Sequence, residues 1–576
     1  MEPFITLNEI DAAAGHIRSC ITITPRVGLV LGSGLGKIAD SVLDPTFIPY
    51  TEIPNWPLST IHGHAGRLVI GDLFGVPSLV MQGRVHYYEG YPMDQVTLPI
   101  RVMQRLGIEI IILTNAAGAI NDDYVPGDDV LLFEDYASDE KFAVFVYYED
   151  EVTPMDRFNL RRQSLYTQGV LVQADPLLTI APLATYKQEQ LPPELEKVIQ
   201  QVALRDTQYT LQVEEVSLDS DLYRLRLERN LTAARAAYAL LRKERPQVAI
   251  LPNGTILEFG AIYQVARYLY IPTITYEFGE QRDRIWLAQN AEVMRQATDD
   301  LWALRRHTPL TAAQLDQVRK LIEARQHATL WENFARRWQG VPSEGGEKVR
   351  TELGLDERPI VLLATNVIGD SLTLGRQVFS DSMTEWLERT VKYFADHPEV
   401  QFVARIHPGE LVTKGPSVAD VVKRALPEIP AHIHLLPADA KINTYDLVEI
   451  ADLGLVYTTT VGMEMVMSGI PVIAAGNTHY RAKGFTLDPE SWQDYFELLN
   501  RVLPDPATYR PSQHQVEQAW NYAYRFFFEY PHPFPWHLLQ MWRDVAAWPL
   551  ERIFSEEGQA HYGKTFKYLL GETIEW

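Results

Sequence analysis

Cysteine is almost absent from this sequence, since Cys20 is the only one among 576 residues. A single cysteine excludes an intrachain disulfide and a zinc site built from cysteines, and it is typical of proteins of a reducing compartment. No run of about 18 consecutive apolar residues occurs, so we expect no segment that spans a membrane. The first residues, MEPFITLNEIDAAAG, carry early acidic side chains and no apolar run. We therefore expect no signal peptide and a cytoplasmic protein.

Basic residues are also scarce relative to acidic ones. The chain has 52 Lys+Arg against 75 Asp+Glu, which gives a formal net charge of −23. This balance argues against nucleic acid or an anionic membrane as the main partner, because both select basic surfaces, but it permits a local phosphate site. Hydrophobic residues make up 46% and charged residues 22%, as in an ordinary globular protein. A single core rarely exceeds about 300 residues, so the length predicts two to four domains.

Short apolar runs that end in glycine or another small residue recur along the chain, and segments with helical periodicity separate them. Strands that alternate with helices are typical of α/β proteins, so we expect an α/β fold with parallel or mixed sheets flanked by helices. The runs are VGLVLGSGLG (27–36), PSLVMQGR (77–84), IEIIILTNAAG (108–118), FAVFVYYED (142–150), QVAILPNG (247–254), YIPTITYEF (270–278), PIVLLATNVIG (359–369), VQFVARIHPGE (400–410), HIHLLP (432–437), LGLVYTTTVG (453–462) and PVIAAG (471–476).

Changes in composition and in residue pattern divide the chain into four predicted parts. Residues 1–135 are glycine-rich, and residues 136–345 combine one βα unit with charged helical segments. Residues 346–500 repeat the βα pattern, and residues 501–576 form an aromatic-rich tail with a helical pattern. An aromatic stripe of this kind usually packs a helix, so we assign it no ligand.

The ends of the first apolar runs carry a candidate phosphate site. The turn around Ser33 offers backbone amides and a hydroxyl to an anion, and Arg84 can bind a phosphate with two hydrogen bonds. His64 and His86 can donate hydrogen bonds to phosphate or sugar, and Tyr88 can lie against a ribose. Taken alone, the glycine-rich turn is equally consistent with a phosphate site and with an ordinary strand-to-helix turn that binds no ligand. Several such side chains at strand ends favour a binding site.

These motifs closely resemble the N-terminal half of trimeric purine nucleoside phosphorylases, over about residues 1–135. The resemblance rests on GLVLGSGLG, HGHAGRLVIG, MQGRVHYYEGY and LTNAAGAIN, in this order and spacing. In that family, phosphate attacks the anomeric carbon of a purine nucleoside and releases the base and ribose 1-phosphate. Positioning and electrostatic stabilisation of the cationic sugar supply most of the catalysis.

The resemblance also implies roles for individual residues. It makes His86 and His64 the catalytic residues, with His64 assisting phosphate, and it places Tyr88 against the ribose. The phosphate-binding residues that it implies are Ser33, Arg84, His86 and Ala116. Inorganic phosphate would be a co-substrate, no other cofactor is implied, and a homo-oligomer is expected. The half that recognises the purine in that family has no counterpart after residue 135, so the purine half-site is missing.

A second candidate site follows the later apolar runs. His407 comes directly after a predicted parallel strand, where sheets of this type bind ligands. Thr459 and Thr460 end another strand and Glu464 lies in the helix that follows, a pattern that suits a diphosphate and ribose hydroxyls. An equally ordinary interpretation makes the threonines a helix cap and Glu464 a charge that complements the helix dipole.

Residues from about 240 to 490 resemble glycosyltransferases with two Rossmann-like lobes, called GT-B, of the capsule polysaccharide biosynthesis type. The motifs are ATNVIGDS (364–371), RIHPGE (405–410), TTTVGMEMVMSGIPVI (458–473) and YRAKGFT (480–486). The resemblance implies that His407, Thr459, Thr460 and Glu464 hold a nucleotide-sugar donor. It makes residues 346–500 the nucleotide lobe and residues 136–345 the acceptor lobe, with ILPNGT (250–255) near the acceptor.

Three hypotheses follow from the sequence. The first is a purine nucleoside phosphorylase-like enzyme, placed first because its residues can be assigned one by one. The second is a glycosyltransferase that uses a nucleotide sugar and a glycan acceptor. The third is an inactive fusion of two truncated modules. We expect no metal site, because no Asp-x-Asp motif stands in a plausible donor loop and no histidines cluster as ligands.

Overall fold

The chain divides into two units in this computed structural model. Unit 1 comprises residues 1–124 and 147–171, and unit 2 comprises residues 125–146 and 172–576. No described helix is long and apolar enough to cross a bilayer. The residues that the structure describes are 6–31, 36–58, 65–85, 91, 93–113, 129–134, 141–146, 178–182, 189–279, 281, 283–327, 341–413, 415–536, 551–574 and 576.

Unit 1 is built on a mixed sheet of five strands in the order β2-β3-β4-β1-β5. β1 pairs in parallel with β4 and β5, whereas β3 pairs antiparallel with β2 and β4. The strands are β1 (Val27–Leu31), β2 (Leu43–Pro49), β3 (Arg67–Leu73), β4 (Val76–Gln82) and β5 (Ile110–Leu113).

Helices cover this sheet because the side chains of each strand alternate between its faces. Leu79 and Met81 pack with helices α1 (Leu7–Cys20) and α2 (Met93–Leu106), whereas Val80 packs on the opposite face. Gly28 allows α2 to approach β1 closely, since a Cβ at that position would lie 2.8 Å from Sδ of Met103.

The first sheet of unit 2 has seven strands in the order β17-β11-β10-β9-β7-β6-β8. Its centre is parallel, because β9 pairs in parallel with both β7 and β10, and the strands outside this centre pair antiparallel. The strands are β6 (Asp129–Glu134), β7 (Lys141–Val146), β8 (Leu178–Pro182), β9 (Val248–Pro252), β10 (Thr273–Phe278), β11 (Arg284–Gln289) and β17 (His532–Pro533).

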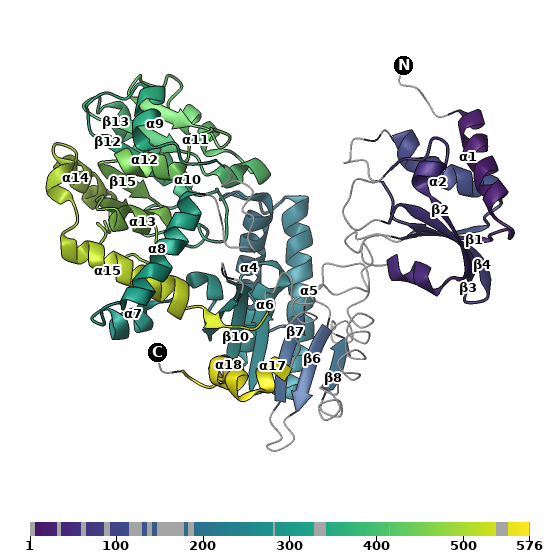
Figure 1. The fold of residues 1–576 in the computed structure, drawn as a ribbon. Coiled ribbons are helices and arrows are strands. Elements are labelled where there is room, and N and C mark those ends of the chain that lie inside the picture. Colours follow the sequence, from purple (N-terminus) through teal and green to yellow (C-terminus); the bar gives the residue numbers. More distant parts are fainter. Residues whose placement is uncertain are drawn as a thin grey trace. The chain divides into compact units, whose positions relative to one another are not determined.

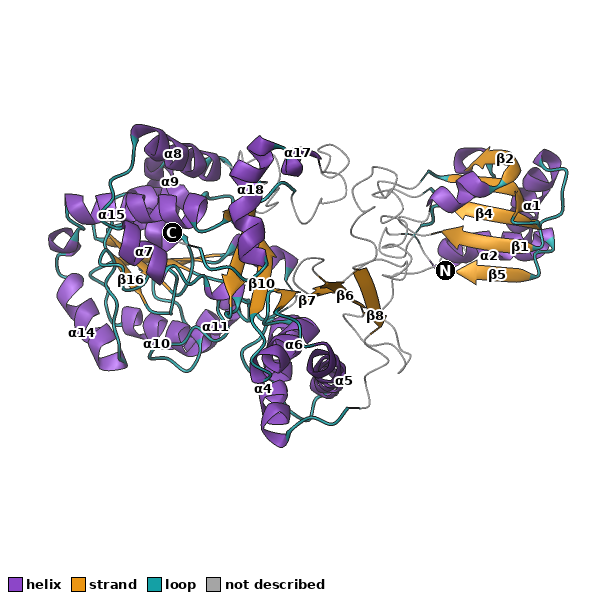
Figure 2. Ribbon diagram, turned by 90° about the horizontal axis from the view of Figure 1, so that it is seen from below, coloured by secondary structure: helices purple, strands orange, loops and turns teal. Residues whose placement is uncertain are grey.

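Both faces of this seven-stranded sheet are covered by helices (Figures 1 and 2). Ala249 and Leu251 of β9 pack against α4, α5 and α6, whereas Val248 packs on the other face beside α17 and α18. The helices are α4 (Pro193–Leu211), α5 (Asp221–Glu244), α6 (Leu257–Tyr268), α17 (Glu551–Phe554) and α18 (Glu556–Leu569).

The second sheet of unit 2 is entirely parallel, in the order β14-β13-β12-β15-β16. The chain enters at β12, adds β13 and β14 on one side, and then adds β15 and β16 on the other. The strand order therefore reverses between β12 and β15, and such a reversal opens a crevice at the carboxyl ends of the strands. The strands are β12 (Ile360–Ala364), β13 (Gln401–Arg405), β14 (Ile433–Leu436), β15 (Leu453–Val456) and β16 (Val472–Ala474).

Helices pack on both faces of this parallel sheet, which explains why its strands are apolar throughout. One face carries α10 (Met383–Ala395), α11 (Val418–Ala425) and α14 (Trp492–Val502). The other face carries α7 (Asp299–Arg305), α8 (Ala312–Gln326), α9 (Gly346–Leu353), α12 (Thr444–Ile450), α13 (Val461–Met467) and α15 (Gln513–Tyr524).

The predicted fold class is confirmed, because the structure is a mixed α/β protein with parallel and mixed sheets flanked by helices. One local difference lies in the aromatic tail, where helical structure is interrupted after Glu529, before α17 and α18. Pro531, Pro533 and Pro535 then stand at alternate positions and cannot continue a helix. This segment instead supplies β17, a short edge strand of the first sheet, where a proline is tolerated.

Replacement of Phe402 by alanine should destabilise unit 2. The side chain is fully buried and stacks on Phe394 with 4.3 Å between ring centroids. A cavity at this position should cost about 3–5 kcal/mol, which calorimetric melting would show as a lower transition temperature. Phe554→Ala is the matched control, because Phe554 is 67% exposed. Equal melting of the two variants would contradict the described packing.

Candidate functional site

Unit 2 contains a cleft of about 400 Å³ into which both of its sheets direct strand ends. Its walls include residues at or just after the carboxyl ends of β9, β10, β12, β13 and β15, all of which have a parallel neighbour. Ligands of parallel sheets bind at this edge, because loops that lead away from each other leave a crevice there and are free to vary. These residues are Asn253 and Thr255, Glu277 and Phe278, Thr365 and Asn366, Arg405 and His407, and Thr458 to Thr460.

Hydrogen bonds join three of these strand ends to one another. Oδ1 of Asn366 accepts from the amide of Thr458 at 3.1 Å, across the point where the strand order reverses. Oγ1 of Thr365 accepts from the amide of His407 at 2.9 Å. The loops after β12, β13 and β15 are therefore held in one arrangement by short side chains.

The ring of His407 has a defined orientation in this wall. Its Nδ1 accepts a hydrogen bond from the amide of Gly409 at 2.9 Å. In the neutral ring the proton then resides on Nε2, which makes Nε2 a donor. The predicted site residue therefore lines the cleft as a hydrogen-bond donor.

The three threonines after β15 add hydroxyl groups to the same wall. Thr459 and Thr460, which the sequence predicts as ligand-binding residues, line the cleft. The carbonyl of Thr459 accepts a hydrogen bond from the Tyr480 hydroxyl at 2.6 Å, which fixes the position of the loop after β15. Oγ1 of Thr458 is buried without a hydrogen-bond partner among the described residues. A buried hydroxyl of this kind gains stability when a ligand supplies a partner.

Glu464 lies beside the cleft rather than on its surface. Its carboxylate forms an ion pair with Arg325 at 2.9 Å and accepts from the Tyr445 hydroxyl at 2.7 Å. Arg325 and Tyr445 both line the cleft, whereas Glu464 does not. Since Arg325 and Glu464 are both nearly inaccessible to water, this pair fixes the positions of the two cleft residues.

Two partly buried carboxyl groups also line the cleft. Burial raises the pKa of Asp370, although Ser371 donates to this carboxylate from its amide at 2.7 Å and from its hydroxyl at 3.2 Å. Burial also raises the pKa of Glu277. The pKa of Tyr209 is raised mainly by burial, and the negative charges of Asp370 and Glu277 raise it further. Carboxyls of raised pKa in a cleft are candidates for proton transfer.

Arg405 brings a buried positive charge to the same wall. The residue is 3% exposed, and its guanidinium donates to the carbonyls of Pro437 at 2.6 Å and Ile442 at 3.4 Å. Burial lowers its pKa to about 10, while the charge of Asp439 acts in the opposite direction. Nε of Arg405 has no hydrogen-bond partner among the described residues.

Several cleft residues were not assigned from the sequence. Asp370 and Arg405 stand inside the motifs ATNVIGDS and RIHPGE, so a search of those motifs for charged residues could have found them. Glu277, Arg325 and Tyr445 carry no comparable signal, since each comes from a segment without a recognised motif. Among the described residues, no group of three or more His, Cys, Asp or Glu side chains is placed to hold a metal ion.

The phosphate and ribose site predicted in unit 1 is described only at Arg84. This half-buried residue follows β4, and the strand end before it is held by the Tyr50 hydroxyl, which donates to the carbonyl of Gly83 at 2.6 Å. The remaining predicted residues lie outside the described residues and stay predictions. They are Ser33, His64, His86, Tyr88 and Ala116.

The described residues define an α/β protein with a polar cleft at the carboxyl ends of parallel strands. Comparison with known proteins bears on its N-terminal region. The family model described as "Phosphorylase superfamily" matches residues 26–216. Purine nucleoside phosphorylase 1 of Geobacillus stearothermophilus is 51% identical over 123 residues, which are 21% of this chain and 45% of that protein. The N-terminal region therefore resembles purine nucleoside phosphorylases, as the sequence motifs predict.

A second curated relative matches the same region, and one solved structure is also similar in sequence. Purine nucleoside phosphorylase 1 of Bacillus subtilis is 48% identical over 125 residues, which are 22% of this chain and 46% of that protein. A crystal structure of schistosoma purine nucleoside phosphorylase in complex with hypoxanthine has 35% identity and a TM-score of 0.20, and covers 34% of this chain and 61% of that one. The chain thus spans about half the length of the curated relatives it matches.

Asp370→Asn should stabilise unit 2 at neutral pH. Because the folded-state pKa of Asp370 is raised, the folded protein binds its proton more tightly than the unfolded chain does. The wild type therefore loses stability as pH rises through that pKa, and the uncharged variant does not. Melting temperatures should nearly coincide at about pH 4 and separate as pH rises to 7. The exposed Asp381 provides the control Asp381→Asn. A pH-independent difference would contradict this account.

Proposed function

We propose that unit 2 transfers a glycosyl group from a nucleotide sugar bound in the cleft. The observation that carries this proposal is the convergence of five strand ends from two α/β sheets on one polar cleft of about 400 Å³. A volume of that size suits a small-molecule ligand. The two sheets also agree with the resemblance of residues 240–490 to glycosyltransferases with two Rossmann-like lobes.

The cleft residues fit the separate requirements of this reaction. Transfer breaks the bond between the anomeric carbon and the leaving phosphate oxygen, and it forms a bond from that carbon to an acceptor oxygen. The leaving diphosphate gains negative charge, which the donors of His407, Thr459 and Thr460 would stabilise. The acceptor hydroxyl loses its proton, and a carboxylate such as Asp370 or Glu277 would accept it.

Glu464 has an indirect role in this proposal. The resemblance implies that it holds the donor nucleotide, but its carboxylate is engaged by Arg325 and Tyr445. We assign the cleft-side contacts with the donor to those two residues, and we assign to Glu464 the task of positioning them.

His407→Ala should reduce turnover of the donor. Purified protein would be incubated with UDP-, GDP- and CMP-sugars in turn, and release of the nucleotide would be measured. Loss of a charge-assisted donor to the leaving group should lower kcat/KM about 10- to 100-fold. His514→Ala is the control, because His514 is exposed on α15. Release of nucleotide that is equal in the two variants, or absent from the wild type with every donor, would refute the proposal.

A second candidate function concerns unit 1, and the observation that favours it is the high identity of its sequence to purine nucleoside phosphorylases. We propose that unit 1 binds phosphate through Arg84 and acts on a purine nucleoside, with the missing purine contacts supplied by another chain. Phosphorolysis would release the base and form ribose 1-phosphate. Positioning of phosphate by Arg84 would supply part of the rate.

Arg84→Ala should abolish this activity. With inosine and inorganic phosphate as substrates, release of hypoxanthine should fall about 100-fold or more. Arg101→Ala removes an exposed arginine of α2 and should leave the rate unchanged. Equal rates in these two variants would exclude the proposed role of Arg84. Absence of both hypoxanthine release and nucleotide release from the wild type would favour an inactive fusion of two truncated modules.

A further inference from the structure

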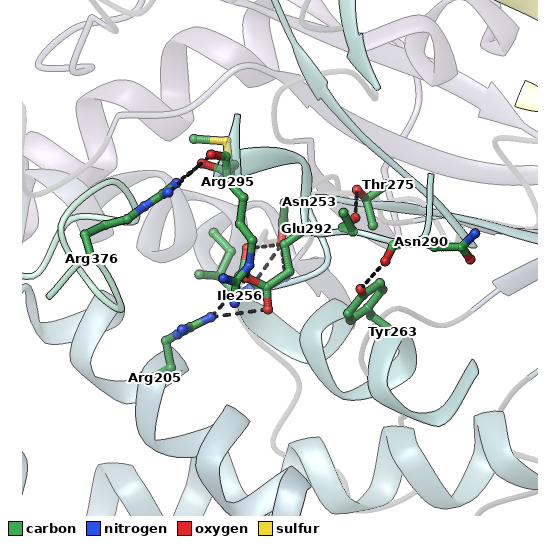
Figure 3. A network of polar contacts seen from close by, with 12 residues as sticks. Arg205, Asn253, Ile256, Tyr263, Thr275, Asn290, Glu292, Arg295 and Arg376 are labelled. Atoms are coloured by element: carbon green, nitrogen blue, oxygen red, sulfur yellow. Dashed lines mark hydrogen bonds and ion pairs between the residues drawn. The ribbon is translucent and has the colours of Figure 1, made fainter. Parts of the chain in front are cut away.

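Two arginines of unit 2 share one carboxylate beside the cleft, and a third binds the main chain next to it. Arg205 extends from α4, Arg295 ends the short helix η6 (Val293–Arg295), and Arg376 follows β12 in the chain. Figure 3 shows Arg205 and Arg376 approaching the segment that carries Glu292 and Arg295 from different elements. The name arginine cluster is used below for Arg205, Arg295 and Arg376.

The arginine cluster has more positive charge than its surroundings neutralise. Nη1 of Arg205 lies 3.3 Å from both carboxylate oxygens of Glu292, and Nε of Arg295 lies 3.0 Å from one of them. Arg376 donates to the main-chain carbonyls of Met294 and Arg295. Among the described residues, two guanidiniums thus share one carboxylate and the third contacts main-chain dipoles, which leaves two positive charges in excess in a chain of net charge −23.

This excess charge is partly withdrawn from water. Arg376 is 9% exposed, and a buried cation is costly unless an anion accompanies it. Burial and the charge of Arg295 lower the pKa of Arg376 to about 10, and Arg205 adds to this effect while Glu292 opposes it. Each guanidinium has five N–H donors in a fork, so a bound tetrahedral anion would find donors on more than one side.

The arginine cluster also borders the cleft directly. Together with Glu292 it lines a small recess, and four residues belong to the walls of both the recess and the cleft. These shared residues are Thr255, Ile256, Met294 and Ser371. The recess alone, of about 20 Å³, is far too small for a sugar or a base. It suits one end of a ligand whose remainder lies in the cleft.

We propose that the arginine cluster binds the phosphoryl dianion of a phosphorylated acceptor, whose hydroxyl-bearing part extends into the cleft. A phosphate monoester carries close to two negative charges at neutral pH, which matches the excess of two positive charges. Arginine binds phosphate bidentately and is therefore suited to fix its orientation. This inference rests on the proposed function of unit 2, because it names the acceptor class of that reaction.

Binding of inorganic phosphate tests the arginine cluster without requiring turnover. All titrations would use Arg84→Ala protein, so that the site proposed in unit 1 does not contribute. Calorimetry at constant ionic strength should detect phosphate, and Arg205→Gln or Arg295→Gln should weaken binding about tenfold. Arg306→Gln removes the same charge from an exposed position and should have no effect. Arg295 is 56% exposed, so its replacement should leave folding intact.

The outcomes separate this inference from other roles. Absence of phosphate binding, or equal affinity in Arg295→Gln and Arg306→Gln, would overturn it and leave the arginine cluster a structural link. Nucleotide release that still depends on His407 would then leave the proposed function standing. Phosphate binding that depends on Arg295, without turnover of any donor, would support the arginine cluster and refute the proposed function.

A competition experiment assigns the dianion to the acceptor or to the donor. UDP and glucose 1-phosphate would each be added to the phosphate titration. Displacement of phosphate by glucose 1-phosphate but not by UDP supports an acceptor site. Displacement by UDP, with the same dependence on Arg295, would show that the arginine cluster binds the donor diphosphate and would overturn the acceptor assignment.

Discussion

The hydrogen bond between the amide of Thr458 and Oδ1 of Asn366 determines how the cleft of unit 2 is arranged. It joins the parallel strands β12 and β15 where the strand order reverses. The loops that follow these two strands therefore lead toward opposite sides of the sheet. Loops that diverge leave space at the carboxyl edge of a sheet, and a short amide side chain holds that space open at a fixed width. The position of His407 depends on the same framework, because its amide is bound to Thr365 in the adjacent strand end.

Local pattern in the sequence was sufficient for the fold class and for part of the site. Buried parallel strands are short apolar runs, so β12, β13 and β15 can be read directly from their residues, and His407, Thr459 and Thr460 from their place after them. Glu464 shows where this reasoning ends. Its partner Arg325 lies in α8, 139 residues earlier in the chain, and only tertiary packing brings the two together. The raised pKa of Asp370 likewise arises from burial, which no local pattern records.

Unit 1 shows a different relation between sequence and structure. Its motifs are specific enough to name a family, and the relatives bear out the resemblance over about half of their length. In the described part of the sheet, β5 is an edge strand that pairs only with β1. All four of its residues, from Ile110 to Leu113, are exposed, although they are aliphatic. Such a strand has the composition of a sheet interior at the position of a sheet border.

The pairing of β17 with β11 makes the first sheet of unit 2 discontinuous along the chain. Ile285 pairs with His532, and the face that holds Val248 and Ile274 is covered by Phe534, Trp536 and α18. During synthesis the ribosome delivers the other strands of this sheet long before the segment that covers them. That apolar face therefore stays open to water while the entire second sheet is being made. The first sheet begins before the second sheet and is completed after it.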